Sequence, residues 1–467
     1  MEKLTLFIQP RHNYAVPNED GHIHLSSPLM VAVARILSAK PGLDFAMEDE
    51  NFGPEKTGEI DADIIGINLV GAPYIPKAIS MIRDRVRSGA GVVLGGQIVN
   101  ALSKEEFARL FSGIRDDVEV VNGNDDLVLE KTFWLQGPMS PKEMVSQVPV
   151  WEKINDAKMK KYLNREFSYY VSQGCTFNCK FCQAEKGKKE KYRDLNVVQE
   201  ELEYLAGKAV SFGIEKLSFY MSNLDGFQTP EKLLEFAKIV ESVKRKFGIK
   251  IEFRCLATLE FFLRAVKNHE GILPTLRNAG FTSVGFGIDG ATPEVWRAIG
   301  KSHNIGDKDK EGLQKSIDAI SICAENGITP EILMVFGHPT DTQESLETAL
   351  DFVQDMANRY GAVPRPHVAK HIIPGADAWR AKENQDIVSQ LIENPEYFQA
   401  LDYAALASEI SHPDAELRKW TNKYYQAMCA MSDRATKYVY PDTPLFREEM
   451  ARDGTTVERV NQGRFDR

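Results

Sequence analysis

The sequence predicts an α/β protein made of two successive parallel-sheet units and a mostly helical C-terminal segment. Strand-like apolar runs alternate with helical patterns over residues 1–140, and this alternation restarts at residue 167 and continues to residue 375. The chain of 467 residues is too long for one ordinary domain. Its hydrophobic content of 43% is sufficient for more than one core.

The first unit is predicted to be a doubly wound parallel sheet. Short apolar runs predict strands at residues 4–8, 43–47, 63–70, 91–96 and 118–123, and helical patterns cover residues 28–37 and 75–86. In such open sheets ligands bind beyond the carboxyl ends of the strands, which here carry glycine or asparagine. No Gly-x-Gly-x-x-Gly sequence follows the first strand, so a nicotinamide or flavin dinucleotide is not indicated.

The second unit begins after residues 141–166, which predict a linker with a short amphipathic helix. Strands are expected at residues 167–174, 216–221, 249–256, 283–288 and 331–336, with helices at 196–212, 230–247, 260–279, 313–326 and 342–359. About six strand–helix units fit a partial parallel barrel, in which chemistry is placed at the carboxyl ends of the strands. Residues 376–467 are expected to form a helical cap to about residue 440, followed by a polar tail.

A loop with three cysteines follows the first strand of the second unit. Cys175, Cys179 and Cys182 have the spacing Cys-x3-Cys-x2-Cys, directly after an aromatic run that ends at Gly174. Three thiolates this close together indicate an iron–sulfur cluster or, less often, a zinc ion. Zinc sites usually pair two short arms, so the spacing favours a four-iron cluster with one iron left open, and a structural zinc is the alternative.

This motif resembles the signature of the radical S-adenosylmethionine (radical SAM) superfamily, in which an aromatic residue, here Phe181, often precedes the third cysteine. The resemblance implies a partial (β/α)6 barrel and a [4Fe-4S] cluster on Cys175, Cys179 and Cys182. It also implies that S-adenosylmethionine binds the open iron and is cleaved to a 5′-deoxyadenosyl radical. An electron donor such as flavodoxin or ferredoxin would then be needed, and a cap would have to exclude water.

Three later segments resemble places where this superfamily contacts S-adenosylmethionine. The resemblance implies that Ser222 and Asn223 handle the methionyl amine, that Asp289 lies near the ribose hydroxyls, and that Gly337 and Pro339 lie near the adenine. Phe181 is expected to contribute from the cysteine motif. The chain departs from the usual Gly-Gly-Glu sequence at Ser222, and Asp289 is one methylene shorter than the usual glutamate.

The first unit resembles the cobalamin-binding domain that precedes many radical SAM domains. The resemblance implies cobalamin contacts from the strand ends, at Pro10, Leu69, Val70, Gly71, Gly95, Gly96, Gln97 and Gly123. The Asp-x-His-x-x-Gly sequence that supplies a cobalt ligand in some cobalamin proteins is absent, so no histidine ligand is expected from that motif. A first unit that binds nothing is the alternative.

Together these resemblances imply a cobalamin-dependent radical SAM methyltransferase. Such an enzyme would act on an unactivated carbon of a small molecule or peptide through methylcobalamin and the 5′-deoxyadenosyl radical. The alternatives are a cyclase or rearrangement enzyme without methyl transfer, a radical SAM enzyme acting on transfer RNA, and a corrinoid-binding or electron-transfer module without turnover. The catalytic residues are not identified by the sequence. Tyr220 and Arg254 are candidates because each lies in a predicted barrel strand.

The composition limits which binding partners and which cellular compartment are expected. The net charge of −10 gives no general attraction for nucleic acid, so no nucleic-acid partner is expected. The one dense basic run, residues 186–193, predicts either a solvated loop or a positive rim that admits an anionic substrate. No long apolar run or signal peptide is present, and the six scattered or clustered cysteines fit a reducing compartment, so a cytoplasmic protein without membrane contact is expected.

Overall fold

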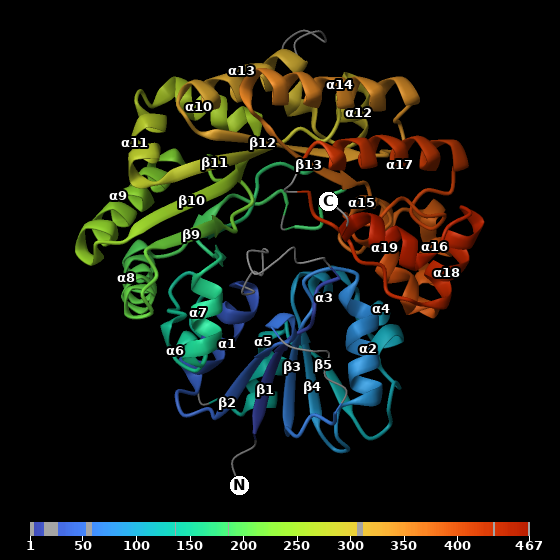
Figure 1. Ribbon diagram of the computed structural model, residues 1–467. Helices are drawn as coiled ribbons and strands as arrows, with labels where there is room; N and C mark the ends of the chain where they lie inside the picture. Colours follow the sequence, from blue (N-terminus) through green and yellow to red (C-terminus); the bar gives the residue numbers. More distant parts are fainter. Residues whose placement is uncertain are drawn as a thin grey trace.

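The computed structural model describes residues 4–13, 27–52, 58–135, 137–184, 186–305, 312–432 and 435–465. It confirms the predicted α/β class, with a five-stranded sheet, a six-stranded sheet and a large helical C-terminal segment (Figure 1). No helix in these ranges has both the length and the apolar character needed to span a bilayer.

The N-terminal sheet is parallel throughout and has the order β2-β1-β3-β4-β5. Its strands are β1 (Thr5–Gln9), β2 (Phe45–Asp49), β3 (Ile64–Asn68), β4 (Gly91–Gly95) and β5 (Glu119–Asn122). The intervening elements are α1 (Ser27–Ala39), η1 (Glu50–Phe52), α2 (Tyr74–Asp84), α3 (Gln97–Ala101), α4 (Lys104–Phe111) and α5 (Asp126–Phe133). The strand order reverses between β1 and β3, which is the switch point where open sheets of this kind bind ligands.

The second sheet is also parallel and has the order β13-β12-β11-β10-β9-β6, a partial barrel. Its strands are β6 (Glu166–Tyr169), β9 (Lys216–Met221), β10 (Lys250–Ala257), β11 (Phe281–Gly287), β12 (Thr329–Phe336) and β13 (Val363–Val368). Its helices are α8 (Leu195–Ser211), α9 (Pro230–Phe247), α10 (Leu259–Asn268), α11 (Ile272–Ala279), α12 (Pro293–Ala298), η2 (Ser302–Asn304), α13 (Gly312–Glu325) and α14 (Gln343–Tyr360).

Two features of this barrel differ from the sequence prediction. The sixth strand, β13, contains Pro364 and Pro366, which mask a strand pattern but are tolerated because β13 lies at the edge of the sheet. The single helix expected at residues 260–279 is divided into α10 and α11, because Gly271 adopts a left-handed conformation with φ 75°.

The linker and the C-terminal segment join the two sheets. The linker helices α6 (Val148–Trp151) and α7 (Asp156–Leu163) are packed into the main core, where Trp151 is 1% exposed. The C-terminal elements are α15 (Asp377–Arg380), η3 (Lys382–Asn384), α16 (Gln385–Glu393), η4 (Pro395–Leu401), α17 (Ala415–Ala430), α18 (Pro444–Arg452) and α19 (Val457–Phe465). Trp379 and Phe398 extend the apolar core of the N-terminal sheet, whereas α17 packs on β13 and α14 (Figure 1).

The predicted polar tail is folded. Helices α18 and α19 enclose a small apolar core that includes Tyr438, Tyr440, Phe446 and Met450, all 5% exposed or less. The expected cap is thus a two-part segment: residues 373–401 lie against the N-terminal domain, and α17 flanks the barrel edge.

Candidate functional site

The cysteine loop is closed on itself by its backbone. Strands β7 (Ser172–Gln173) and β8 (Lys191–Tyr192) form a short antiparallel hairpin, and the loop between them carries all three cysteines. The amide of Lys188 donates to the Cys175 carbonyl at 2.9 Å. Gly174, with φ 103°, opens the loop, and a Cβ there would lie 2.7 Å from the Lys189 carbonyl oxygen. Only glycine fits this start of the loop.

The three thiols form one electrostatic group. Burial raises the pKa of the Cys175 thiol to about 11, and both other thiols add to the increase. Burial also raises the pKa values of Cys179 and Cys182. Among the described residues no three His, Cys, Asp or Glu side chains converge on one ion. A cluster binds each thiolate at a different iron and displaces the thiol protons, so this donor set fits a cluster without such convergence.

A buried ion pair anchors the hairpin to the barrel. The guanidinium of Arg193 donates to both carboxylate oxygens of Glu201, at 2.6 and 2.7 Å, and both side chains are 0% exposed. Arg193 also donates to the carbonyls of Tyr170 and Val145. Arg193 belongs to the basic run of residues 186–193, but its burial makes it a structural residue that fixes the start of the cysteine loop.

A second buried pair lies beside the cysteines. The ammonium of Lys301 lies 2.7 Å from Asp289 Oδ2, and Lys301 is only 4% exposed. Asp289 has φ 53°, an uncommon conformation for a residue other than glycine. The positive charge of Lys301 acts to lower the pKa of Cys179 and of Cys182. Sequence reasoning identified Asp289 but missed Lys301, since no motif marks a lysine that only the fold brings here.

The end of β9 holds a buried amide without a partner. Asn223 is 2% exposed, and neither its side-chain oxygen nor its nitrogen has a hydrogen-bond partner among the described residues. Ser222 instead donates to the Tyr169 carbonyl at 3.2 Å. Because a buried unpaired amide is costly, the Asn223 side chain fits a place where a bound molecule completes its hydrogen bonds.

The two catalytic candidates lie in an ion-pair network inside the barrel. Arg254 donates to the carboxylate of Glu166, and its Nη1 lies 3.5 Å from Glu331. Glu331 also pairs with Arg365 at 3.0 Å. The Arg254 guanidinium lies 4.5 Å from the centre of the Tyr220 ring. The network links strands β6, β10, β12 and β13, and the Tyr220 ring adds β9.

On the other side of the loop, Phe181 packs near two histidines. Its ring centre lies 5.6 Å from that of His338 and 6.5 Å from that of His371. Nε2 of His338 donates to the Asp289 carbonyl at 3.1 Å, so Nδ1 accepts from His371 Nε2 at 2.9 Å. Burial lowers the pKa of His338, which favours this neutral arrangement.

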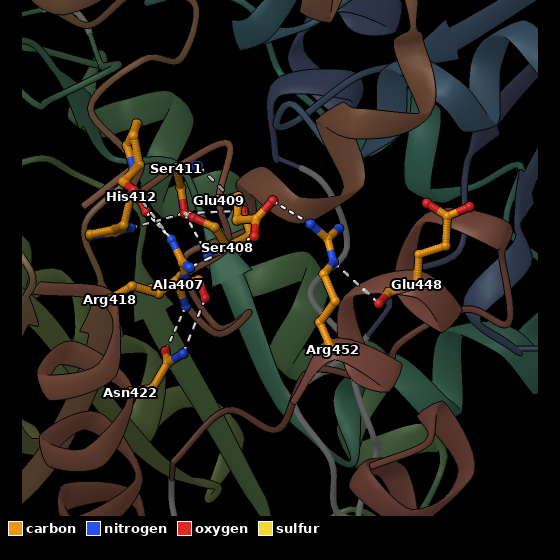
Figure 2. Close-up of polar contacts among 10 residues, drawn as sticks. Ala407, Ser408, Glu409, Ser411, His412, Arg418, Asn422, Glu448 and Arg452 are labelled. Carbon is orange, nitrogen blue, oxygen red and sulfur yellow. Dashed lines mark hydrogen bonds and ion pairs between the residues drawn. The ribbon is translucent and has the colours of Figure 1, made fainter. Parts of the chain in front are cut away.

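The turn at Gly337 lies beneath the C-terminal segment. Nε2 of His412 donates to the Gly337 carbonyl at 2.8 Å. Figure 2 shows how α17 holds the loop that carries His412: Arg418 donates to the His412 carbonyl at 2.8 Å, and Asn422 exchanges two hydrogen bonds with Ala407. Pro339 is exposed. Contacts of Gly337 and Pro339 with an adenine stay a prediction.

The predicted cobalamin residues lie together at the carboxyl edge of the N-terminal sheet. Val70 and Gln97 are exposed there, and Gly71, Gly95, Gly96 and Gly123 are partly exposed. Gly96 has φ 106°, and a Cβ there would lie 2.5 Å from the Leu69 carbonyl oxygen. Pro10 and Leu69 are buried, so Leu69 can offer a ligand only its backbone. Because these glycines have no side chains, the backbone at this edge is accessible to a large flat ligand.

The two units meet at the cysteine loop. A Cβ at Gly375, just after β13, would lie 3.3 Å from Ala101 Cβ and 3.3 Å from Gln183 Cα. Gln183 directly follows the third cysteine, and Ala101 ends α3, the helix that follows β4. The carboxyl edge of the N-terminal sheet points toward the barrel (Figure 1). The cysteine loop and the glycine-rich edge therefore lie on facing sides of one interface.

Comparisons with known proteins agree with this architecture. Residues 169–353 match the radical SAM superfamily model. An uncharacterized methyltransferase of Pyrococcus horikoshii is 24% identical over 337 residues, which cover 66% of this chain and 68% of the relative. The hopanoid C-2 methylase of Rhodopseudomonas palustris is 25% identical over 210 residues, 44% of this chain and 36% of the methylase.

Two solved structures share the fold over most of the chain. The methyltransferase TsrM from Kitasatospora setae, with tryptophan substrate and a SAM analogue bound, aligns with a TM-score of 0.56 and 16% identity over 83% of this chain and 76% of TsrM. The cobalamin-dependent enzyme OxsB, with aqua-cobalamin bound, aligns with a TM-score of 0.52 and 12% identity over 85% of this chain and 56% of OxsB. Residues 169–353 are therefore a radical SAM domain, and the chain is an enzyme whose fold is shared with TsrM and OxsB, both of which carry cobalamin in solved structures.

Proposed function

We propose that the protein is a cobalamin-dependent radical SAM methyltransferase that transfers a methyl group to an unactivated carbon of a small molecule or peptide. The observation that carries the proposal is the position of Gly375, where a Cβ would contact both Gln183, next to the third cysteine, and Ala101, at the end of the helix that starts from the glycine-rich edge. When bound, the cluster would supply the electron that cleaves S-adenosylmethionine, and cobalamin would carry the methyl group.

The chain's own residues would position these groups. Cys175, Cys179 and Cys182 would hold the cluster. The Asn223 side-chain amide, which has no hydrogen-bond partner among the described residues, would form hydrogen bonds with S-adenosylmethionine. The ammonium of Lys301, which lies 2.7 Å from Asp289 and acts electrostatically on Cys179 and Cys182, would donate to a carboxylate of the bound molecule. Phe181 and the residues around Gly337 would cover the same side of the bound molecule.

The glycine-rich edge would hold the corrin. Val70 and Gln97 present exposed side chains at this edge, while the backbone at Gly71 and Gly95 permits close approach. The similarity to TsrM, whose structure contains tryptophan, supports a small-molecule substrate. The substrate carbon would have to lie in the interface, because both reacting groups face it. A reducing, cytoplasmic location is part of the proposal and agrees with the free thiols of Cys175, Cys179 and Cys182.

A pair of variants tests the division of labour. Cys175→Ala should remove the cluster and the formation of 5′-deoxyadenosine, while cobalamin binding stays within about twofold of the wild type. Gly96→Ala should weaken cobalamin binding while the cluster and the formation of 5′-deoxyadenosine are kept. The added Cβ would collide with the Leu69 carbonyl at the glycine-rich edge. Iron content, cobalamin absorbance and nucleoside products are measured after anaerobic purification with cobalamin supplied. If Cys175→Ala loses cobalamin together with iron, the two sites are not arranged as proposed.

A further inference from the structure

Residues 374–380, which follow β13 and include helix α15, contact both the cysteine loop and the N-terminal domain. We call them the bridging segment. At the cysteine loop, Nε2 of Gln183 donates to the Pro374 carbonyl at 3.2 Å, and the Asp377 amide donates to the Lys180 carbonyl at 2.8 Å. Because Lys180 and Gln183 lie on either side of the third cysteine, the bridging segment holds this part of the loop from both sides.

An ion pair adds a third contact between the bridging segment and the cysteine loop. The ammonium of Lys186 donates to the Asp377 carboxylate at 2.7 Å and to the Cys179 carbonyl at 2.9 Å. The Lys186 side chain is only 15% exposed, so both hydrogen bonds are largely shielded from solvent. Asp377 thus fixes the cation that binds the backbone of the second cysteine.

The other end of the bridging segment is attached to the N-terminal domain. The Arg380 guanidinium donates to the Ala101 carbonyl and to Glu106 Oε1, both at 2.8 Å. Nε1 of Trp379 donates to the same Glu106 oxygen at 2.9 Å, and the Trp379 ring is fully buried in the apolar core of the N-terminal sheet. The segment is therefore fixed to the end of α3 and to the start of α4.

Helix α3 connects this attachment to the glycine-rich edge. It has only five residues, from Gln97 to Ala101, and its N-cap is Gly96. At 1.5 Å for each residue, the two ends of α3 are about 6 Å apart. A ligand held at Gly96 and Gln97 would therefore contact one end of a short helix whose other end holds the bridging segment.

We infer that the bridging segment couples the two cofactor sites, so that cobalamin at the glycine-rich edge tightens the binding of S-adenosylmethionine at the cluster. This inference rests on the proposed function, which places cobalamin at that edge. A bound corrin restricts the motion of α3 and hence of the bridging segment. Less conformational entropy is then lost when S-adenosylmethionine orders the cysteine loop. Asp377 and Arg380 are the positioning residues of this coupling.

The test measures affinities, not turnover. The dissociation constant of S-adenosylmethionine is determined by anaerobic equilibrium dialysis on the cluster-loaded protein, with and without hydroxocobalamin. Reductant is left out so that S-adenosylmethionine is not cleaved. The wild type should bind S-adenosylmethionine at least about fivefold more tightly with cobalamin. Because such coupling is reciprocal, S-adenosylmethionine should tighten cobalamin binding by the same factor.

Two variants release the bridging segment, one at each end. Arg380→Met removes the contacts with Ala101 and Glu106, and Asp377→Asn removes the ion pair with Lys186. Each should reduce the coupling factor to about twofold or less, while S-adenosylmethionine affinity without cobalamin stays within about threefold of the wild type. Asp386→Asn is the matched control, because Asp386 is exposed at the start of α16, and it should keep the full factor.

The comparison separates coupling from a merely structural role. A segment that only stabilises the fold would change S-adenosylmethionine affinity equally with and without cobalamin, and that result overturns the inference. A wild type that binds both molecules independently also overturns it, and leaves the proposed function intact. A wild type that binds no cobalamin would overturn the proposed function and the coupling together. Iron content is measured for every variant to show that the cluster is kept.

Discussion

Replacing Glu201 by glutamine should open the hairpin that carries the cysteine loop. The Glu201 carboxylate accepts four hydrogen bonds: from Arg193 at 2.6 and 2.7 Å, from the Tyr169 hydroxyl at 2.7 Å and from the Gln147 amide at 2.7 Å. A glutamine amide turns one accepting oxygen into a donor that faces donors. It also leaves the Arg193 guanidinium, which is 0% exposed, without a counter-charge.

The expected cost is about 3–5 kcal/mol, because removing one partner leaves the other charge buried. At about 1.4 kcal/mol for each factor of ten, the open hairpin becomes roughly a hundredfold to a few thousandfold more populated. Amide hydrogen exchange at β7 and β8 measures this opening locally, without assuming that a chain of several domains unfolds in one step. Glu200→Gln is the matched control, since Glu200 is the exposed neighbour on α8. Equal hairpin exchange in the two variants would refute the reasoning.

Three further predictions concern the surroundings of the loop. Burial raises the pKa of the Asp225 carboxyl to about 7. The folded chain therefore binds this proton more tightly than the unfolded chain, and the free energy of unfolding should fall as the pH rises from about 4 to about 7. Asp225→Asn should flatten that part of the pH profile in urea titrations, and an unchanged slope would contradict it. Gly337→Ala should cost about 2–4 kcal/mol, since its φ is 86° and its Cβ would lie 2.5 Å from His412 Nε2. Gly361→Ala, with φ 64° and open space, should cost only about 1 kcal/mol, so equal melting temperatures for both variants would contradict the close packing. Lys301→Met should weaken S-adenosylmethionine binding about tenfold or more in equilibrium dialysis while iron content is kept, and unchanged affinity would remove Lys301 from the site.

The sequence alone was sufficient to predict those features whose pattern lies within a few neighbouring residues. Cys175, Cys179 and Cys182 lie within eight residues, so their spacing alone indicated a cluster loop. Apolar runs likewise marked the five strands of the N-terminal sheet to within a few residues. Both signals depend on neighbours in the chain.

The remainder depends on contacts between distant segments. Lys301 approaches Cys179 only because the turn after α12 packs on the cysteine loop, where the Lys180 amide donates to the Ile299 carbonyl at 2.9 Å. The role of Arg193 depends on Glu201, whose charge predicts a surface residue but whose fold position is fully buried. The prolines of strand β13 obscured its strand pattern in the sequence. The polar tail is folded because Phe446 and Met450 pack in one apolar core with Tyr438 and Tyr440. Periodicity reports which face is buried, not which partner buries it.

The central claim is that one interface holds a reducible cluster and cobalamin together. The most direct measurement is the product count after the cobalamin-loaded protein, purified without oxygen, is incubated with dithionite and S-adenosylmethionine. The account predicts both 5′-deoxyadenosine and S-adenosylhomocysteine, with the first lost in Cys175→Ala. Retention of cobalamin and cluster with 5′-deoxyadenosine but no S-adenosylhomocysteine would contradict methyl transfer, and absence of 5′-deoxyadenosine would contradict the radical chemistry itself.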